Sequence, residues 1–438
     1  MFVDDLHLFC KGDVKSIFII METFKRFSST SGLTINSEKS DFYCNRMSQH
    51  VVQRVLQGIG FKKGELPFKY LGVKISHKRL TKINCNVLVD RMIARIRGWK
   101  SRKISYSGRL ILVKSVLSTI HNHWSQIFVL PVSIMDRIQA LCKTFLWEGS
   151  DNYSRSPLVA WNVLCMDNEH GVLGLTDSKI WNYATIGKLV WWVTSKQDHL
   201  WIKWVDHIYL KGTPWFQYEP TTYSSWAWRK VCQIKTMFQN GYTNGLWNGD
   251  IKEYTISSGY NWLLQNTGSK VPWFKIVWNR YNVPKWNFTM WLVQQKRLLT
   301  LDRLRKWGMD VPIECFLCGQ APEDHQHLFQ QCRFTQQCLQ LLANWLGLSS
   351  GLLLKPECHL RLRYLSAYAR KVCSDAVVGL YYRIWRCRNV CRLEGYVPTP
   401  TLLVLQIQED CNRQIQGCFK GYMKHTDSDW NRLRNINI

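Results

Sequence analysis

The chain has 438 residues, and its 58 lysine and arginine residues against 31 aspartate and glutamate residues give a formal charge of +27. Apolar residues make up 46% of it, which excludes wholesale disorder and allows two or three folded domains. The positive excess favours a nucleic-acid partner over a merely basic soluble protein. We expect no signal peptide, no membrane span and no disulfide scaffold, and therefore an intracellular protein in which clustered cysteines bind metal.

The first motif is FVDDLHLFC at residues 2–10, which predicts a strand, a turn and a second strand with Asp4 and Asp5 at the tip. Paired carboxylates at such a tip can bind Mg²⁺ and offset the charge of a triphosphate during nucleotidyl transfer. An isolated Asp-Asp pair is more often only a turn, so the motif needs support from the rest of the chain. An amphipathic helix is predicted next, over residues 14–29.

Three further helices are predicted from apolar residues at helical spacing, over residues 84–97, 107–126 and 133–147. Basic residues crowd into the first part of this segment: Arg91, Arg95, Arg97, Lys100, Arg102, Lys103, Arg109 and Lys114. A run of charges is often only a solvated face of a helix. Because all of these charges have one sign, a surface that faces phosphates is the better interpretation.

The next segment, 150–245, is rich in tryptophan and mostly helical, and its clearest helix contains WNYATIGKLVWWV. Glycine and asparagine at 240–250 indicate a domain boundary. Two more helices are predicted, over 370–392 and 399–424. The first contains Cys387 and Cys391, whose spacing is weak evidence for a metal site and fits core or surface thiols better.

The strongest signal for chemistry lies in ECFLCGQAPEDHQHLFQQC. Cys315 and Cys318 form a Cys-x2-Cys knuckle, and His327 and Cys332 follow as His-x4-Cys. Four sulfur and nitrogen ligands without an open position predict structural zinc, and thiolates favour zinc over harder metals. His325 is an alternative fourth ligand, and chance spacing of metal-free cysteines is the competing explanation.

In this order, the segments resemble the C-terminal part of a plant non-LTR (LINE-type) retrotransposon reverse transcriptase. FVDDLHLFC resembles the catalytic palm box of that family, SGLTINSEKSDFYC the box that follows it, and LPFKYLGVKIS the primer-grip region. The basic helices resemble the thumb. The region from YTISSGYNWL through the Cys/His cluster resembles the reverse-transcriptase zinc-binding module. YYRIWRCRN resembles a helix near the C-terminal end of proteins of this family.

The resemblance implies an RNA-directed DNA polymerase with RNA and DNA as template–primer, acting in the nucleus. It implies that Asp4 and Asp5 bind Mg²⁺, that Lys39 lies near the leaving pyrophosphate, and that the zinc module helps to grip nucleic acid. The chain begins at the Asp-Asp box, without fingers and upstream palm, so we expect no polymerase activity from it alone. A domesticated zinc-dependent nucleic-acid or protein interaction module is the alternative.

The expected fold class is α+β, with a truncated palm hairpin, a helical thumb, a Trp-rich connector, a small zinc-binding module and C-terminal helices. The corresponding boundaries are a partial palm at 1–80, a thumb at 81–150, a connector at 151–250, a zinc-binding domain at 251–350 and a C-terminal helical region at 351–438.

Overall fold

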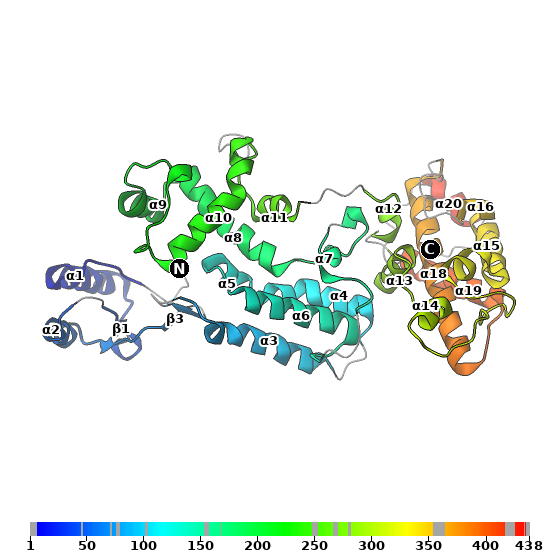
Figure 1. The fold of residues 1–438 in the computed structure, drawn as a ribbon, viewed down its shortest axis with the longest axis horizontal. Coiled ribbons are helices and arrows are strands. Elements are labelled where there is room, and N and C mark those ends of the chain that lie inside the picture. Colours follow the sequence, from blue (N-terminus) through cyan, green and yellow to red (C-terminus); the bar gives the residue numbers. More distant parts are fainter. Residues whose placement is uncertain are drawn as a thin grey trace. The chain divides into compact units, whose positions relative to one another are not determined.

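In the part of the chain that the computed structural model describes, most residues are helical and the few strands form two small two-stranded sheets (Figure 1). This architecture confirms the α+β fold class. No helix within the described residues is both long and apolar enough to cross a membrane. The structure describes residues 7–44, 47–70, 72–75, 79–100, 104–152, 157–166, 168–247, 253–265, 270–278, 282–353, 364–416, 425–432 and 434.

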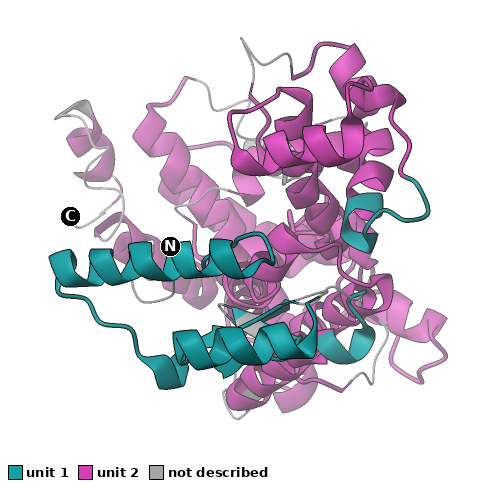
Figure 2. Ribbon diagram, turned by 90° about the vertical axis from the view of Figure 1, so that its left-hand side faces the viewer, with its two compact units in different colours: residues 1–84, 221–229 teal, residues 85–220, 230–438 magenta. Residues whose placement is uncertain are grey.

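The chain divides into two compact units, which Figure 2 distinguishes by colour. The first unit consists of residues 1–84 and 221–229, and the second of residues 85–220 and 230–438. The five-part division made from the sequence is finer than these two units and stays a prediction.

The first unit contains two helices that contact each other, α1 and α2, and two short strand pairs. Asp13 starts α1, because its carboxylate accepts a hydrogen bond from the Ser16 backbone N–H at 2.8 Å, and Gly32 ends it at a φ of 72°. β1 pairs with β2 in parallel, and β3 with β4 in antiparallel orientation. The elements are α1 (Val14–Ser31), η1 (Ser37–Lys39), β1 (Asp41–Phe42), α2 (Gln49–Ile59), β2 (Lys62–Lys63), β3 (Phe68–Tyr70) and β4 (Val73–Ile75).

The strand pair predicted over residues 2–10 is not found in its described part. Residues 2–6, which include Asp4 and Asp5, lie outside the described residues. Residues 7–10 are not in a strand, because neither described sheet gives them a pairing partner for their backbone N–H and C=O groups.

The second unit opens with the helices predicted as a thumb. They are α3 (Lys82–Lys100, which begins just before the unit boundary), α4 (Tyr106–Ser115), η2 (Leu117–Thr119), α5 (Asn122–Ile127) and α6 (Val132–Glu148). The single helix predicted over 107–126 is therefore wrong, since it is broken into α4, η2 and α5. The Thr119 hydroxyl donates to the Val116 carbonyl at 2.9 Å, and such side-chain bonds compete with the regular helical ladder.

A buried asparagine on the next long helix fixes the end of this bundle. The Asn182 side-chain amide donates to the Ser125 and Phe128 carbonyls at 2.9 and 2.8 Å, and its oxygen accepts from the Leu130 N–H at 2.9 Å.

The connector elements are α7 (Trp161–Leu164), η3 (Asn168–His170), α8 (Ser178–Thr194), α9 (Leu200–Val205), η4 (Asp206–Leu210), η5 (Trp215–Gln217) and α10 (Trp226–Thr243).

The last part of the second unit contains α13 packed on α18, and α15 packed on both α18 and α19. Trp286 and Trp291 of α13 are almost completely buried, and the Trp291 indole donates to the Gly171 carbonyl at 2.9 Å. The elements are α11 (Ile256–Leu264), α12 (Phe274–Val277), α13 (Pro284–Gln294), α14 (Leu301–Lys306), η6 (His327–Gln331), α15 (Arg333–Leu346), α16 (Ser350–Leu353), α18 (Ala367–Glu394), α19 (Pro400–Gln414) and α20 (His425–Arg432).

Candidate metal centre

The Cys-x2-Cys knuckle lies in a tight loop between α14 and η6. The Cys315 N–H donates to the Ala321 carbonyl at 2.9 Å, and the Gly319 N–H donates to the Cys315 carbonyl at 2.8 Å. Gly319 has a φ of 64°, a left-handed conformation that glycine adopts without steric cost. These bonds fold the chain back on itself directly after Cys318, so both thiols are presented by one turn.

The second ligand pair comes from a short helical turn and the start of a long helix. The Asp324 carboxylate accepts a hydrogen bond from the His327 N–H at 2.6 Å, and the Cys332 N–H donates to the His327 carbonyl at 2.7 Å. Cys332 is the residue that caps α15, and the Thr335 hydroxyl ties that helix back to the Leu328 carbonyl at 2.7 Å. His327 and Cys332 are therefore held in one rigid η6–α15 corner.

The two pairs converge on one point. The ligand atoms of Cys315, Cys318, His327 and Cys332 all lie within 4.8 Å of one another. The Cys315 and Cys332 sulfurs are 4.0 Å apart, and the Cys318 sulfur is 3.3 Å from the His327 Nε2. Bonds of about 2.3 Å from zinc to sulfur give a tetrahedron with edges of roughly 3.8 Å, so these separations suit a bound zinc ion.

The structure also distinguishes the two candidate histidines. His327 lies in the cluster, whereas the His325 Nε2 is 3.2 Å from the Leu298 carbonyl and is engaged there. The His325 ring also lies beside Phe329, with ring centroids 6.1 Å apart. His325 therefore bonds to the loop before α14, and His327 is the histidine that completes the Cys3His group able to hold a metal ion.

Local hydrogen bonds favour the thiolate form of one ligand. The pKa of Cys332 is lowered, first by the side-chain hydrogen bond from Cys315 and further by backbone N–H groups of Thr335 and Phe334. These N–H groups are the free donors at the start of α15, where a negative charge is stabilised. Metal ligation requires deprotonated cysteine, so the fold prepares Cys332 for that role.

All four coordination positions of a bound zinc ion would be filled by these side chains, so none would be open to a substrate. Three cysteines and one histidine complete the four-coordinate shell that structural zinc takes, and three of the four side chains are buried. When zinc is bound, it supplies a crosslink between the knuckle and the η6–α15 corner. The cluster is therefore a folding centre and has no open position for catalysis.

A buried ion pair beside the centre was not anticipated from the sequence. The Arg388 Nε lies 2.9 and 3.0 Å from the two Glu323 carboxylate oxygens, and both side chains are at most 1% exposed. The same carboxylate accepts from the Leu301 N–H at 3.1 Å, so it also anchors the first turn of α14. The Arg388 guanidinium lies over Phe316, inside the knuckle, at 5.6 Å.

This ion pair joins the zinc loop to α18. The Cys391 thiol strengthens the same junction by donating to the Phe316 carbonyl at 3.2 Å, one residue after Cys315. Cys387 and Cys391 are both buried, and neither belongs to the metal cluster. The zinc loop and α18 are therefore packed against each other.

The remaining residues predicted to act in polymerisation are only partly described. Lys39 is exposed and ends η1, whose first turn is held by hydrogen bonds from the Glu38 and Lys39 N–H groups to the Asn36 side chain at 3.0 and 3.2 Å. Asp4 and Asp5 lie outside the described residues. Their relation to Lys39 stays a prediction.

The predicted nucleic-acid face of α3 has the expected separation of apolar and basic residues. Leu88, Met92 and Ile96 are fully buried, whereas Arg91 and Arg95 are exposed. Of the neighbouring basic residues, Arg97 is exposed and pairs with Asp151 at 2.9 Å, and Lys114 is exposed on α4. Lys100 ends α3, and Arg102 and Lys103 lie outside the described residues.

Arg109 differs from the other members of this basic group. Its guanidinium donates to the Ile104 carbonyl at 3.1 Å and to the Trp147 carbonyl at 3.2 Å. Burial lowers the pKa of the Arg109 side chain, which is half-buried in the bundle. These contacts give Arg109 a structural task, connecting the start of α4 to the end of α6.

Comparison with known proteins agrees with the geometry. Residues 254–338 match the family model described as zinc-binding in reverse transcriptase. The Arabidopsis thaliana protein named "Putative ribonuclease H protein At1g65750" is 33% identical over 127 residues, which is 29% of this chain and 20% of that protein. The alignment thus spans about a fifth of the relative's length. Together these findings support a retroelement-related chain with a reverse-transcriptase zinc-binding domain.

We predict that His327→Ala abolishes metal binding, because it removes the fourth ligand from a closed shell. His325→Ala is the matched control, since it removes a neighbouring imidazole that makes no contact with the cluster. Metal analysis of the purified proteins should find roughly one zinc per chain in the parent and in His325→Ala, and none in His327→Ala. Zinc lost in His325→Ala and kept in His327→Ala would reverse the assignment.

A second prediction concerns the buried ion pair. Arg388→Met leaves the Glu323 carboxylate buried without its cation, which costs about 3–5 kcal/mol of unfolding free energy. Arg386→Met, at an exposed position of the same helix, should change it by less than about 0.5 kcal/mol. Urea unfolding of the zinc-loaded proteins measures both values, and equal stability of the two variants would contradict the structural role of Arg388.

Proposed function

We propose that this chain is the C-terminal part of a LINE-type retrotransposon reverse transcriptase and that it binds an RNA–DNA template–primer. The observation that carries the proposal is the match of residues 254–338 to a reverse-transcriptase zinc-binding family, in a segment with a complete Cys3His ligand set. The order of the palm-like, thumb-like and zinc-binding motifs along the chain supports the same conclusion.

Charge and geometry support nucleic acid as the partner. The formal charge of +27 favours a polyanion, and the exposed Arg91 and Arg95 lie one helical turn apart on α3. Their helix is anchored by a fully buried apolar stripe, so the guanidinium groups stand on a rigid support. Phosphate contacts from such a face add affinity without reading the base sequence.

The zinc centre has a supporting task in this proposal. It orders the loop between α14 and α15 and, through Glu323 and Arg388, connects that loop to α18. Asp4 and Asp5 are proposed to bind Mg²⁺ in the polymerase site, with Lys39 near the leaving pyrophosphate. Reverse transcription onto chromosomal DNA would take place in the nucleus.

The proposal is tested by neutralising the α3 face. Arg91→Gln combined with Arg95→Gln should weaken binding to an RNA–DNA hybrid roughly tenfold and reduce the slope of log affinity against log salt by about 2. Arg413→Gln combined with Arg432→Gln removes the same charge from exposed positions of α19 and α20 and should have little effect. Fluorescence anisotropy over a salt series measures both quantities.

Two outcomes would count against this function. Equal weakening by both double variants would mean that only total charge matters and that α3 has no special part. Hybrid binding that is absent or independent of salt would instead favour a domesticated protein-interaction module.

A further inference from the structure

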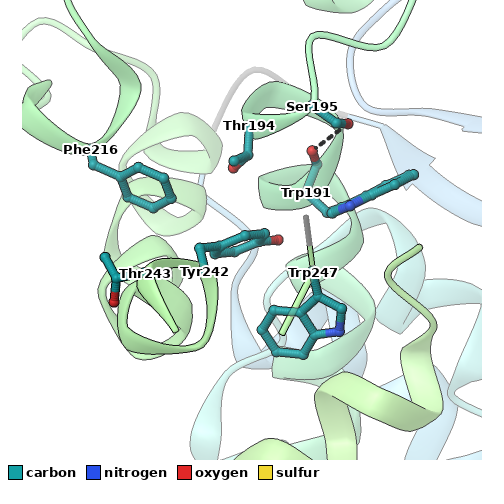
Figure 3. Close-up of a pocket in the computed structure, with 7 residues that line it drawn as sticks. All are labelled: Trp191, Thr194, Ser195, Phe216, Tyr242, Thr243 and Trp247. Carbon is teal, nitrogen blue, oxygen red and sulfur yellow. Dashed lines mark hydrogen bonds between the residues drawn. The ribbon is translucent and has the colours of Figure 1, made fainter. Parts of the chain in front are cut away.

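A cavity of about 300 Å³ opens in the Trp-rich connector, away from the zinc centre. It lies where the end of α8, the η5 turn and the end of α10 meet, as Figure 3 shows. The residues that line it are Trp191, Thr194, Ser195, Phe216, Tyr242, Thr243 and Trp247. Neither the zinc site nor the basic face of α3 uses this cavity.

Aromatic rings form most of the wall. The Phe216 and Tyr242 ring centroids are 5.6 Å apart with planes inclined by 48°, and Tyr242 and Trp247 are 5.2 Å apart at 56°. Phe216 and Tyr242 are only partly buried, whereas Trp247 is 4% exposed. The partly exposed rings of Phe216 and Tyr242 give the opening an aromatic edge against which a planar guest can stack.

A buried lysine holds one side of this wall in place. The Lys235 ammonium, 1% exposed, donates to the Tyr218 carbonyl at 2.7 Å and to the Trp215 carbonyl at 3.3 Å. It also lies 5.1 Å from the centre of the Trp215 ring. The turn that carries Phe216 is therefore fixed before any ligand arrives, and preorganisation of this kind reduces the entropy lost on binding.

The hydroxyl groups at the rim are acceptors. Thr194 and Ser195 donate their hydrogens to the Val190 and Trp191 carbonyls, both at 2.8 Å, and Thr243 donates to the Asn240 carbonyl at 3.1 Å. Each oxygen keeps lone pairs, because a hydroxyl has one hydrogen and two acceptor positions. The cavity thus offers aromatic faces together with acceptors for N–H groups.

We propose that this cavity binds an unpaired nucleobase of a single-stranded segment in the bound nucleic acid. Every base has a planar face, and the base edges carry the N–H donors that the rim can accept. The volume is at the lower end of the roughly 300–1,000 Å³ found for small-ligand sites, which suits one base. The exposed Lys196 directly follows Ser195 and adds a cation for the neighbouring phosphate.

This inference rests on the proposed function, since the positive charge of the chain is the reason to expect a nucleic-acid strand at its surface. It goes beyond that function because the α3 face contacts phosphates, whereas the cavity selects unpaired bases. The two sites are therefore separable by the kind of nucleic acid that each needs.

The test compares a short single-stranded RNA, the same strand with abasic positions and a blunt RNA–DNA hybrid. Phe216→Ala and Tyr242→Ala should each weaken binding of the intact single strand roughly tenfold, as expected when one base–aromatic stack is lost. Both should leave hybrid binding unchanged. Tyr223→Ala, which removes a tyrosine that is 98% exposed and lies outside the cavity, is the control and should change neither.

A second measurement uses the unchanged protein and so does not depend on whether a variant folds. A strand that contains 5-iodouridine should, on irradiation of the unchanged protein, crosslink to Phe216, Tyr242 or Trp247, as identified by mass spectrometry of the peptides. Crosslinks exclusively at other residues, or a folded Phe216→Ala that binds the single strand as well as the parent, would overturn the cavity assignment alone. Failure of the parent protein to bind both the single strand and the hybrid would instead remove the proposed function itself.

Discussion

The convergence of Cys315, Cys318, His327 and Cys332 is the constraint on which the end of the chain depends. Between α14 and η6 the backbone has only an isolated bridge between Glu314 and Pro322 and a few turn hydrogen bonds. A loop with so little regular structure cannot offset its own conformational entropy. A metal ion bound by four side chains supplies that free energy, because the binding of structural zinc is also folding free energy.

One buried ion pair connects the zinc-binding loop to the neighbouring helices. Glu323 lies in the zinc loop, and its carboxylate bonds both to Arg388 of α18 and to the first N–H of α14. A buried ion pair contributes little net stability compared with apolar residues, but each member is costly to leave alone. The pair therefore acts mainly as a specific connection, which holds the loop in one position relative to α18.

Local patterns in the sequence were sufficient for the long amphipathic helices and for the metal ligands. The four ligands lie within one short segment, so their spacing alone defines the site, whereas the choice of His327 over His325 required the position of the Leu298 carbonyl. Glu323 and Arg388 are 65 residues apart and look like ordinary surface charges in a sequence. The break of the predicted 107–126 helix was also hidden, because the helical spacing of Val116, Ile120 and Trp124 runs through it without interruption. The aromatic cavity needed three separate segments to be brought together.

The central claim is that three thiolates and the His327 imidazole bind one structural zinc ion. X-ray absorption spectroscopy at the zinc edge of the purified chain tests it most directly, because it counts ligand atoms by type and distance. We expect three sulfur neighbours at about 2.3 Å and one nitrogen at about 2.0 Å. A shell that contains oxygen, two nitrogen neighbours or no bound zinc would contradict it.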